Sequence, residues 1–97
     1  MLTIEASPDG SVTLAGRLDA VQAPQAQAAF DRLGGRVVVD CTALDYISSA
    51  GLGVLLKTQK RLLGAGGGLR LVGVSRHIRD IFVYSGFDQI LEIEPAA

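Results

Sequence analysis

Two adjacent hydroxyl-bearing residues, Ser48 and Ser49, have the position in this chain that best suits chemistry. They follow an apolar strand candidate over residues 36–40, across a short polar turn, and a leucine-rich helix begins at one of them. A helix N-terminus has unpaired backbone N–H groups and the positive end of the helix dipole, so it favours a capping hydroxyl or an attached anion. The residues leave two compatible roles open, a helix cap and a phosphate acceptor.

Nucleophilic catalysis by either serine is poorly supported by the rest of the sequence. A catalytic serine needs a base, and the one histidine, His77, falls in a later predicted helix. The local pattern Ser48-Ser49-Ala50-Gly51 does not match the G-x-S-x-G elbow of hydrolases. We therefore expect a protein that is not an enzyme.

Nucleotide and metal binding are also weakly supported. Gly51-Leu52-Gly53 opens a helix after a strand, but Leu56 stands where G-x-G-x-x-G needs its third glycine. The run at residues 64–68 follows a helix, so we interpret it as a helix stop. Cys41 is expected to be a small buried apolar residue, and one His with one Cys gives no metal-site spacing. No cofactor and no metal are expected.

Composition indicates one folded globular domain, with no pattern typical of a membrane-spanning or nucleic-acid-binding chain. The 97 residues are 48% hydrophobic and 20% charged, which is typical of a globular chain. The net charge of -1 gives no electrostatic reason to bind nucleic acid. We see no signal-peptide pattern and no apolar stretch long enough to span a bilayer, and the single cysteine fits a reducing compartment. We expect a cytoplasmic protein.

Hydrophobic periodicity predicts the elements that position the serines. Alternation over residues 2–17 predicts a β-hairpin around a Ser-Pro-Asp-Gly turn. An apolar face over residues 21–33, beginning with Val21, predicts a helix that Asp19 starts or precedes. The valine run at residues 37–39 predicts a strand covered on both faces.

The second half of the chain continues the same alternation of strands and helices. After the helix at the serine pair, we expect a strand near residues 69–72 and a helix that Ser75 caps and Gly86 ends, with Tyr84 among its apolar residues. A last strand is expected near residues 90–93. The order β-β-α-β-α-β-α-β predicts an α/β domain with a mixed, mostly parallel sheet of about five strands and helices packed on it.

The segment at residues 40–52 resembles the signature of the STAS domain of bacterial anti-sigma factor antagonists. Residues 16–20, Gly-Arg-Leu-Asp-Ala, are similar to the upstream motif of that family, and residues 73–75 and 86–88 also match it. The resemblance covers residues 1–97 and implies a single STAS domain. Relatives usually carry a further C-terminal helix, for which this sequence shows no counterpart.

The resemblance implies a regulatory module in bacterial signal transduction and transcription regulation. In such proteins the unphosphorylated domain binds an anti-sigma factor that is also a serine kinase of the histidine-kinase-like ATPase type, and binding frees the sigma factor. Phosphorylation of a serine at the start of the second helix weakens that complex, and a serine phosphatase restores it. This exchange of partners is termed partner switching.

The resemblance also assigns site residues. By the spacing of the family, the phosphate acceptor is Ser49, and Ser48 is the alternative because many members have Asp there. The implied partner surface comprises Asp19, Ser48, Ser49, Ala50, Gly51, Leu52 and Gly53. The alternative function is a STAS scaffold that is not phosphorylated, or a subunit of a lipid-transport or signalling complex. Self-association is left open.

Overall fold

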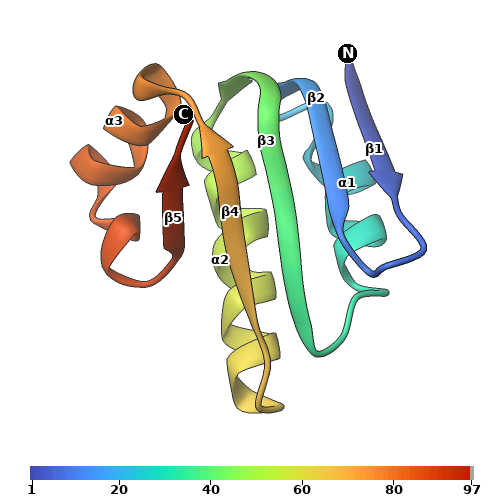
Figure 1. Cartoon of the computed structure of the whole chain (residues 1–97). Helices are drawn as coiled ribbons and strands as arrows, with labels where there is room; N and C mark the ends of the chain where they lie inside the picture. The colour runs from blue at the N-terminus through green and yellow to red at the C-terminus, as the bar shows by residue number, and fades with distance from the viewer. Residues whose placement is uncertain (97) are drawn as a thin grey trace.

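The computed structural model describes residues 1–96. Along the chain it contains β1 (Leu2–Ala6), β2 (Val12–Leu18), α1 (Ala23–Phe30), β3 (Arg36–Ile47), α2 (Ser49–Gly64), β4 (Gly68–Val74), α3 (Arg76–Ser85), the 3₁₀ turn η1 (Phe87–Gln89) and β5 (Glu92–Pro95), as Figure 1 shows. The predicted order of strands and helices is confirmed. The turn η1 was not predicted from the sequence.

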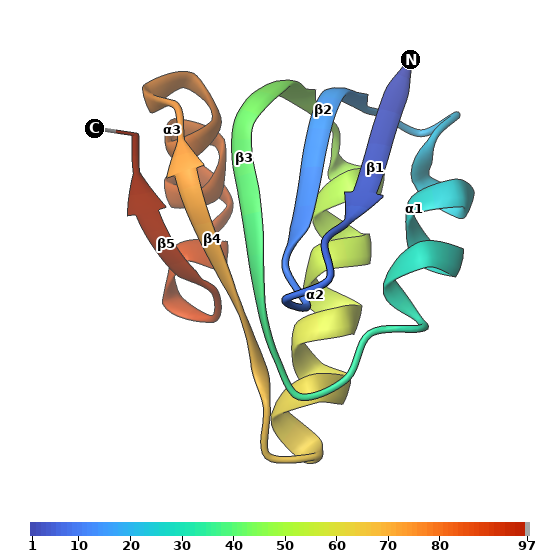
Figure 2. The same ribbon diagram turned by 45° about the vertical axis from the view of Figure 1, so that its right-hand side comes forward.

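The five strands form one sheet in the order β1-β2-β3-β4-β5. β1 is antiparallel to β2, and every other neighbouring pair is parallel. Each parallel crossover steps in the same direction along the sheet, and such crossovers are right-handed, so their helices must fall on one face. Figures 1 and 2 show α1, α2 and α3 together on one side of the sheet.

The second face of β3 is open, so the prediction of a strand covered on both faces was wrong. Val37 and Val39 point toward the helices and are 3% and 0% exposed, whereas Val38 points the other way and is 37% exposed. A run of valines suits any pleated, partly buried surface, and does not say how many faces are covered. The direction in which the chain crosses the sheet decides whether helices cover one face of β3 or both.

β3 is also longer than predicted, because it continues through the segment interpreted as a polar turn. Cys41, Leu44 and Ile47 are buried, and pairing with β2 continues as far as Ile47. Asp40 accepts hydrogen bonds from the hydroxyl and the backbone N–H of Thr42, at 2.7 and 2.9 Å, and these bonds lower the pKa of Asp40. The buried residues Cys41, Leu44 and Ile47 are three positions apart, because the register of pairing with β2 shifts twice along this segment, so a simple alternating pattern does not mark the strand here.

α1 is shorter than the predicted helix over residues 21–33. Asp19 does precede it, in a turn in which the Asp19 carboxylate accepts a hydrogen bond from the backbone N–H of Gln22 at 3.0 Å. Val21 lies in this turn and is 81% exposed, so its predicted place on the apolar face was wrong. The turn ends before the helical period begins at Ala23.

The predicted caps of α3 are confirmed, but two apolar residues lie elsewhere than expected. Ser75 accepts a hydrogen bond from the backbone N–H of Ile78 at 3.3 Å, and Gly86 ends the helix with a left-handed φ of 77°. Tyr84 is 90% exposed and is not part of the apolar face. Ile90 precedes β5 and is 40% exposed, so the last strand starts later than predicted.

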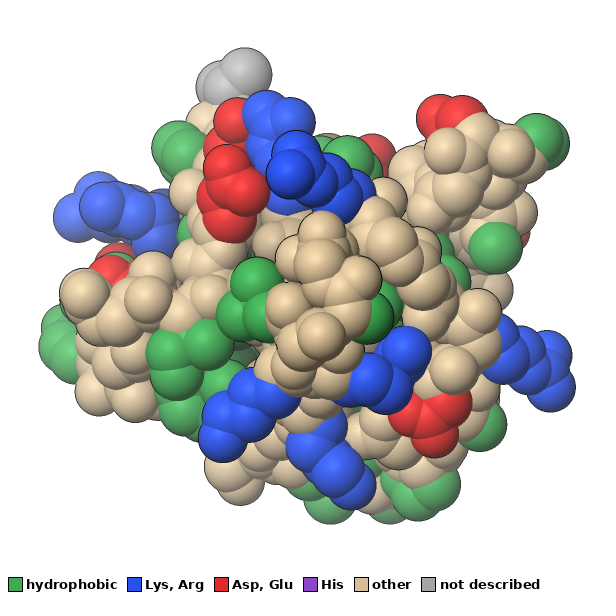
Figure 3. Space-filling view, turned by 90° about the horizontal axis from the view of Figure 1, so that it is seen from below, with side chains coloured by type: hydrophobic (Ala, Val, Ile, Leu, Met, Phe, Trp, Pro, Cys, Tyr) green, Lys and Arg blue, Asp and Glu red, His purple; other side chains and the backbone are tan. Residues whose placement is uncertain are grey.

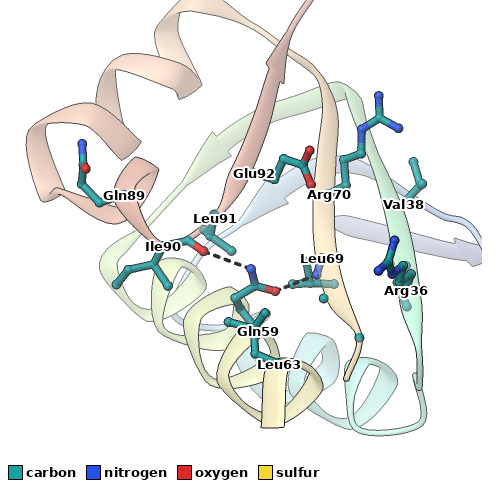
Figure 4. A pocket seen from close by; sticks show the side chains of 13 residues that line it. Arg36, Val38, Gln59, Leu63, Leu69, Arg70, Gln89, Ile90, Leu91 and Glu92 are labelled. Atoms are coloured by element: carbon teal, nitrogen blue, oxygen red, sulfur yellow. Dashed lines mark hydrogen bonds between the residues drawn. The ribbon is translucent and has the colours of Figure 1, made fainter. Parts of the chain in front are cut away.

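One buried polar side chain joins α2 to the edge of the sheet. Gln59 is 4% exposed, its Oε1 accepts from the backbone N–H of Leu69 at 2.6 Å, and its Nε2 donates to the carbonyl of Ile90 at 3.0 Å (Figure 4). The pairing of β4 with β5 starts at Arg70 and Glu92. The carboxamide therefore replaces a strand partner where β4 and β5 diverge.

Replacing this carboxamide should destabilise the fold. Gln59→Leu leaves the N–H of Leu69 and the carbonyl of Ile90 without their partner, so the free energy of unfolding should fall by about 1–3 kcal/mol in urea denaturation. Lys60→Leu, on the exposed side of the same helix, is the control and should stay within about 0.5 kcal/mol of wild type. Equal stability of the two variants would contradict the bridging role.

Candidate functional site at the N-terminus of α2

The carboxyl ends of the parallel strands β2 and β3 lie side by side. Leu18 pairs with Ile47, and the backbone N–H of Ser48 donates to the carbonyl of Leu18 at 2.9 Å. Asp19 follows the first strand and the serines follow the second, so the two sequence motifs meet at one edge of the sheet. This edge is where α/β proteins commonly place their binding sites.

Ser48 is the N-cap of α2. Its backbone is extended, with φ -94° and ψ 174°, and its hydroxyl oxygen accepts from the backbone N–H of Gly51 at 3.3 Å. Its carbonyl accepts from the N–H of Leu52 at 2.9 Å, which starts the helical ladder. Ser48 therefore takes the structural role that the sequence left open for the pair.

Ser49 is the first helical residue, and it is exposed. Within residues 1–96 its hydroxyl makes no hydrogen bond, and the first turn of α2 carries no acidic side chain. The positive end of the helix dipole is thus not neutralised by a carboxylate of its own turn. An anion attached at Ser49 would meet a favourable local field.

Gly51 and Gly53, in the first turns of α2, differ in how closely other parts of the chain pack against them. A Cβ on Gly51 would lie 2.7 Å from the carbonyl oxygen of Leu18 and 2.9 Å from the Ile47 side chain, so the close packing of helix on strand requires glycine there. A Cβ on Gly53 would meet nothing within 4 Å. Glycine at position 53 weakens the helix by about 1 kcal/mol relative to alanine, with no packing reason inside this chain.

The remaining predicted site residues divide between surface and core. Ala50 is exposed beside Ser49, whereas Leu52 is 6% exposed and packs in the core. The structure thus gathers Asp19, Ser48 and Ser49 at the edge, and turns the side chain of Leu52 away from it. Leu52 can support the edge but offers it little side-chain surface.

Sequence reasoning missed three neighbours of this edge. The guanidinium of Arg17 lies 4.3 Å from the centre of the Tyr46 ring and 3.9 Å from the carboxylate of Asp19. Val21 projects from the turn that follows Asp19. Arg and Tyr are frequent in the central contacts of protein interfaces. The β2–β3 register, which pairs Arg17 with Tyr46, was the missing information.

Neither His77 nor Cys41 is hydrogen-bonded to the serine pair within residues 1–96. His77 is exposed on α3. Cys41 is 0% exposed, and burial raises the pKa of its thiol to about 12, which agrees with the small apolar role expected for it. In the described part of the chain, no three potential metal ligands cluster, and no helix is long and apolar enough to cross a membrane.

Comparison with known proteins identifies the family. The family model described as "Mlab, STAS domain" matches residues 3–92. BtrV of Bordetella bronchiseptica, which bears the name of an anti-sigma factor antagonist, is 39% identical over 84 residues, covering 82% of this chain and 72% of that protein. The chain belongs to the STAS domain family that includes such antagonists.

Solved structures of similar proteins have the same fold. An anti-sigma factor antagonist from Mycobacterium paratuberculosis superimposes with a TM-score of 0.78 at 26% identity, covering 98% of this chain and 85% of that one. The Bacillus cell fate determinant SpoIIAA in its phosphorylated form gives a TM-score of 0.70 at 20% identity, covering 96% and 90%, which shows the fold alone. The predicted α/β fold is confirmed.

The division of roles between the serines can be tested by stability. Ser48→Ala removes the N-cap and should lower the free energy of unfolding by about 1 kcal/mol, whereas Ser49→Ala should change it by less than about 0.5 kcal/mol. Urea denaturation of both variants beside wild type measures the difference. A larger loss in Ser49→Ala than in Ser48→Ala would contradict this assignment.

Proposed function

We propose that this protein is an anti-sigma factor antagonist, whose unphosphorylated form binds an anti-sigma factor through the N-terminal edge of α2 and thereby frees a sigma factor. The observation that carries the proposal is Ser49, an exposed hydroxyl at the positive end of a helix that a different serine caps. A modification of Ser49 would leave the cap intact. It would change the surface and not the fold.

The proposed partner is an anti-sigma factor that is also a serine kinase of the histidine-kinase-like ATPase type. Phosphorylation of Ser49 would add close to two negative charges and three acceptor oxygens. In the centre of a protein interface this dianion is bulky and must be desolvated, so the complex should weaken. A serine phosphatase would reverse the change. The protein would act as a cytoplasmic regulator and not as an enzyme.

A second candidate function is a STAS scaffold in a lipid-transport or signalling complex. The matching family model favours it, since its description names Mlab and not an anti-sigma factor antagonist. In that case Ser49 would stay unmodified, and the same edge would hold a permanent partner. The two candidates differ in whether charge at Ser49 controls binding.

The switch can be tested by capturing partners from a lysate of the source cells and by measuring the intact mass of the native protein. We expect wild type and Ser49→Ala to retain a kinase-like ATPase, and Ser49→Asp to lose it. Purified kinase should add one phosphate to wild type and none to Ser49→Ala. Ser75→Asp is the matched control, because it places the same charge at the N-cap of α3, outside the proposed partner surface, and Asp also caps helices. It should bind as wild type does.

Two results would contradict the proposed switch. One is phosphorylation of Ser49→Ala at the wild-type rate, which would move the acceptor to Ser48 or elsewhere. The other is equal capture of the same partner by wild type and Ser49→Asp, with no phosphate on the native protein. That second result would support the scaffold function.

Gly53 gives a separate test of the partner surface. Gly53→Ala should stabilise the fold by about 0.5–1 kcal/mol, because the added methyl group meets open space and favours the helix. The same methyl group should weaken partner binding if the partner packs closely on this turn. Calorimetry with the captured partner and urea denaturation measure the two effects.

Two other glycines of α2 provide controls for Gly53. A Cβ on Gly64, at the far end of the helix, also meets nothing within 4 Å, so Gly64→Ala should leave the affinity unchanged. Gly51→Ala should destabilise the fold through its contact with Leu18. Unchanged affinity in Gly53→Ala would place the partner contact away from this turn.

A further inference from the structure

We propose that the cleft where β4 and β5 diverge binds a small aliphatic carboxylate, of the type of a medium-chain fatty acid. The cleft has a volume of about 730 Å³, within the range of small-molecule sites. It lies at the amino end of β4, at the opposite end of α2 from Ser49. Figure 3 shows this end of the molecule, where hydrophobic side chains lie among Lys and Arg and among Asp and Glu side chains.

Three partly exposed aliphatic side chains line this cleft. Val38, Leu63 and Ile90 are 37%, 53% and 40% exposed and come from β3, α2 and the segment before β5. Leu63 stands one turn beyond Gln59 on the same face of α2, as Figure 4 shows. Exposed apolar side chains that converge in a hollow are typical of a binding site.

The charged side chains that line the cleft are Arg36, Arg70 and Glu92, and Glu92 lies near Arg70. Arg70 forms an ion pair with Glu94 and is therefore occupied. Arg36 is exposed, and within residues 1–96 its guanidinium makes no ion pair or hydrogen bond. A guanidinium with free N–H groups binds a carboxylate through two parallel hydrogen bonds. Arg36 is thus the group that would hold the head of the ligand.

The space between Arg36 and Ile90 is kept open by a glycine. Figure 4 shows Arg36 and Val38 on β3, across β4 from Ile90. A Cβ on Gly68 would lie 3.6 Å from both Gln59 Oε1 and the Leu63 side chain, in ordinary contact, so glycine leaves a passage there without being required by the fold. β3 and β5 are two strand spacings apart, roughly 10 Å, a distance that an extended octanoate spans.

A small ligand fits this cleft better than a protein partner does. Specific protein interfaces bury about 1,000 Å² or more, and three partly exposed aliphatic side chains supply only a small part of that. They do suit one short acyl chain. The buried amide of Gln59 forms the floor of the cleft. Its Oε1 and Nε2 are both hydrogen-bonded within the protein, so this amide does not require a polar group of the ligand.

The side-chain NH₂ signal of Gln59 in ¹⁵N NMR spectra gives a local readout of binding. Titration of the labelled full chain with sodium octanoate should shift this signal in a saturable way. Arg36→Gln should raise the apparent Kd at least about fivefold, since a charge-assisted contact is lost. Gly68→Ala should also weaken binding by narrowing the passage, and 1-octanol should bind wild type more weakly than octanoate does.

Arg79→Gln, on the exposed face of α3, is the matched control and should bind octanoate as wild type does. Three results would overturn the inference. One is a shift of the Gln59 signal that does not saturate, and another is an Arg36→Gln variant, folded by its backbone spectrum, with the wild-type Kd. The third is equal shifts at exposed apolar residues outside the cleft, such as Val21 and Tyr84, which would indicate non-specific adsorption.

Discussion

The contact between the first turn of α2 and the end of β2 is the constraint on which the candidate site depends. Gly51 lets the helix backbone come against Leu18, and the N–H of Ser48 closes a hydrogen bond to the Leu18 carbonyl. This contact sets the angle at which the chain leaves the sheet. It places Asp19 beside the serines, uses the hydroxyl of Ser48 for the cap, and leaves Ser49 facing outward. A looser turn would not separate the two serines in this way.

The arrangement of the sheet explains why the residues of the candidate site lie at one edge. Every parallel crossover steps in the same direction, so the helices cover one face and the turns that enter them lie at the carboxyl ends of the strands. The opposite end of the sheet is held differently. There β5 separates from β4, and the amide of Gln59 closes the gap with two hydrogen bonds. One end of α2 thus carries the candidate site, and the other end lies beside a cleft.

Local patterns in the sequence were sufficient for the order of elements and for the caps of α2 and α3. The strand alternation, the Ser75 cap and the Gly86 stop depend on neighbours a few residues away, and such interactions can be read along the chain. The pairing of Arg17 with Tyr46 and the bridge from Gln59 to Ile90 join distant residues, so they required the register. Whether Val38 and Val21 are covered depends on where other elements pack, and periodicity does not encode that.

Cys41 lies in the central strand β3 with its thiol sealed from solvent. With a pKa of about 12, the thiol gives almost no thiolate at neutral pH, so oxidants and alkylating reagents find no nucleophile while β3 stays in place. Any labelling of this sulfur must then follow an opening of the centre of the sheet. The reactivity of Cys41 therefore reports local opening of the sheet, at a residue outside the candidate site.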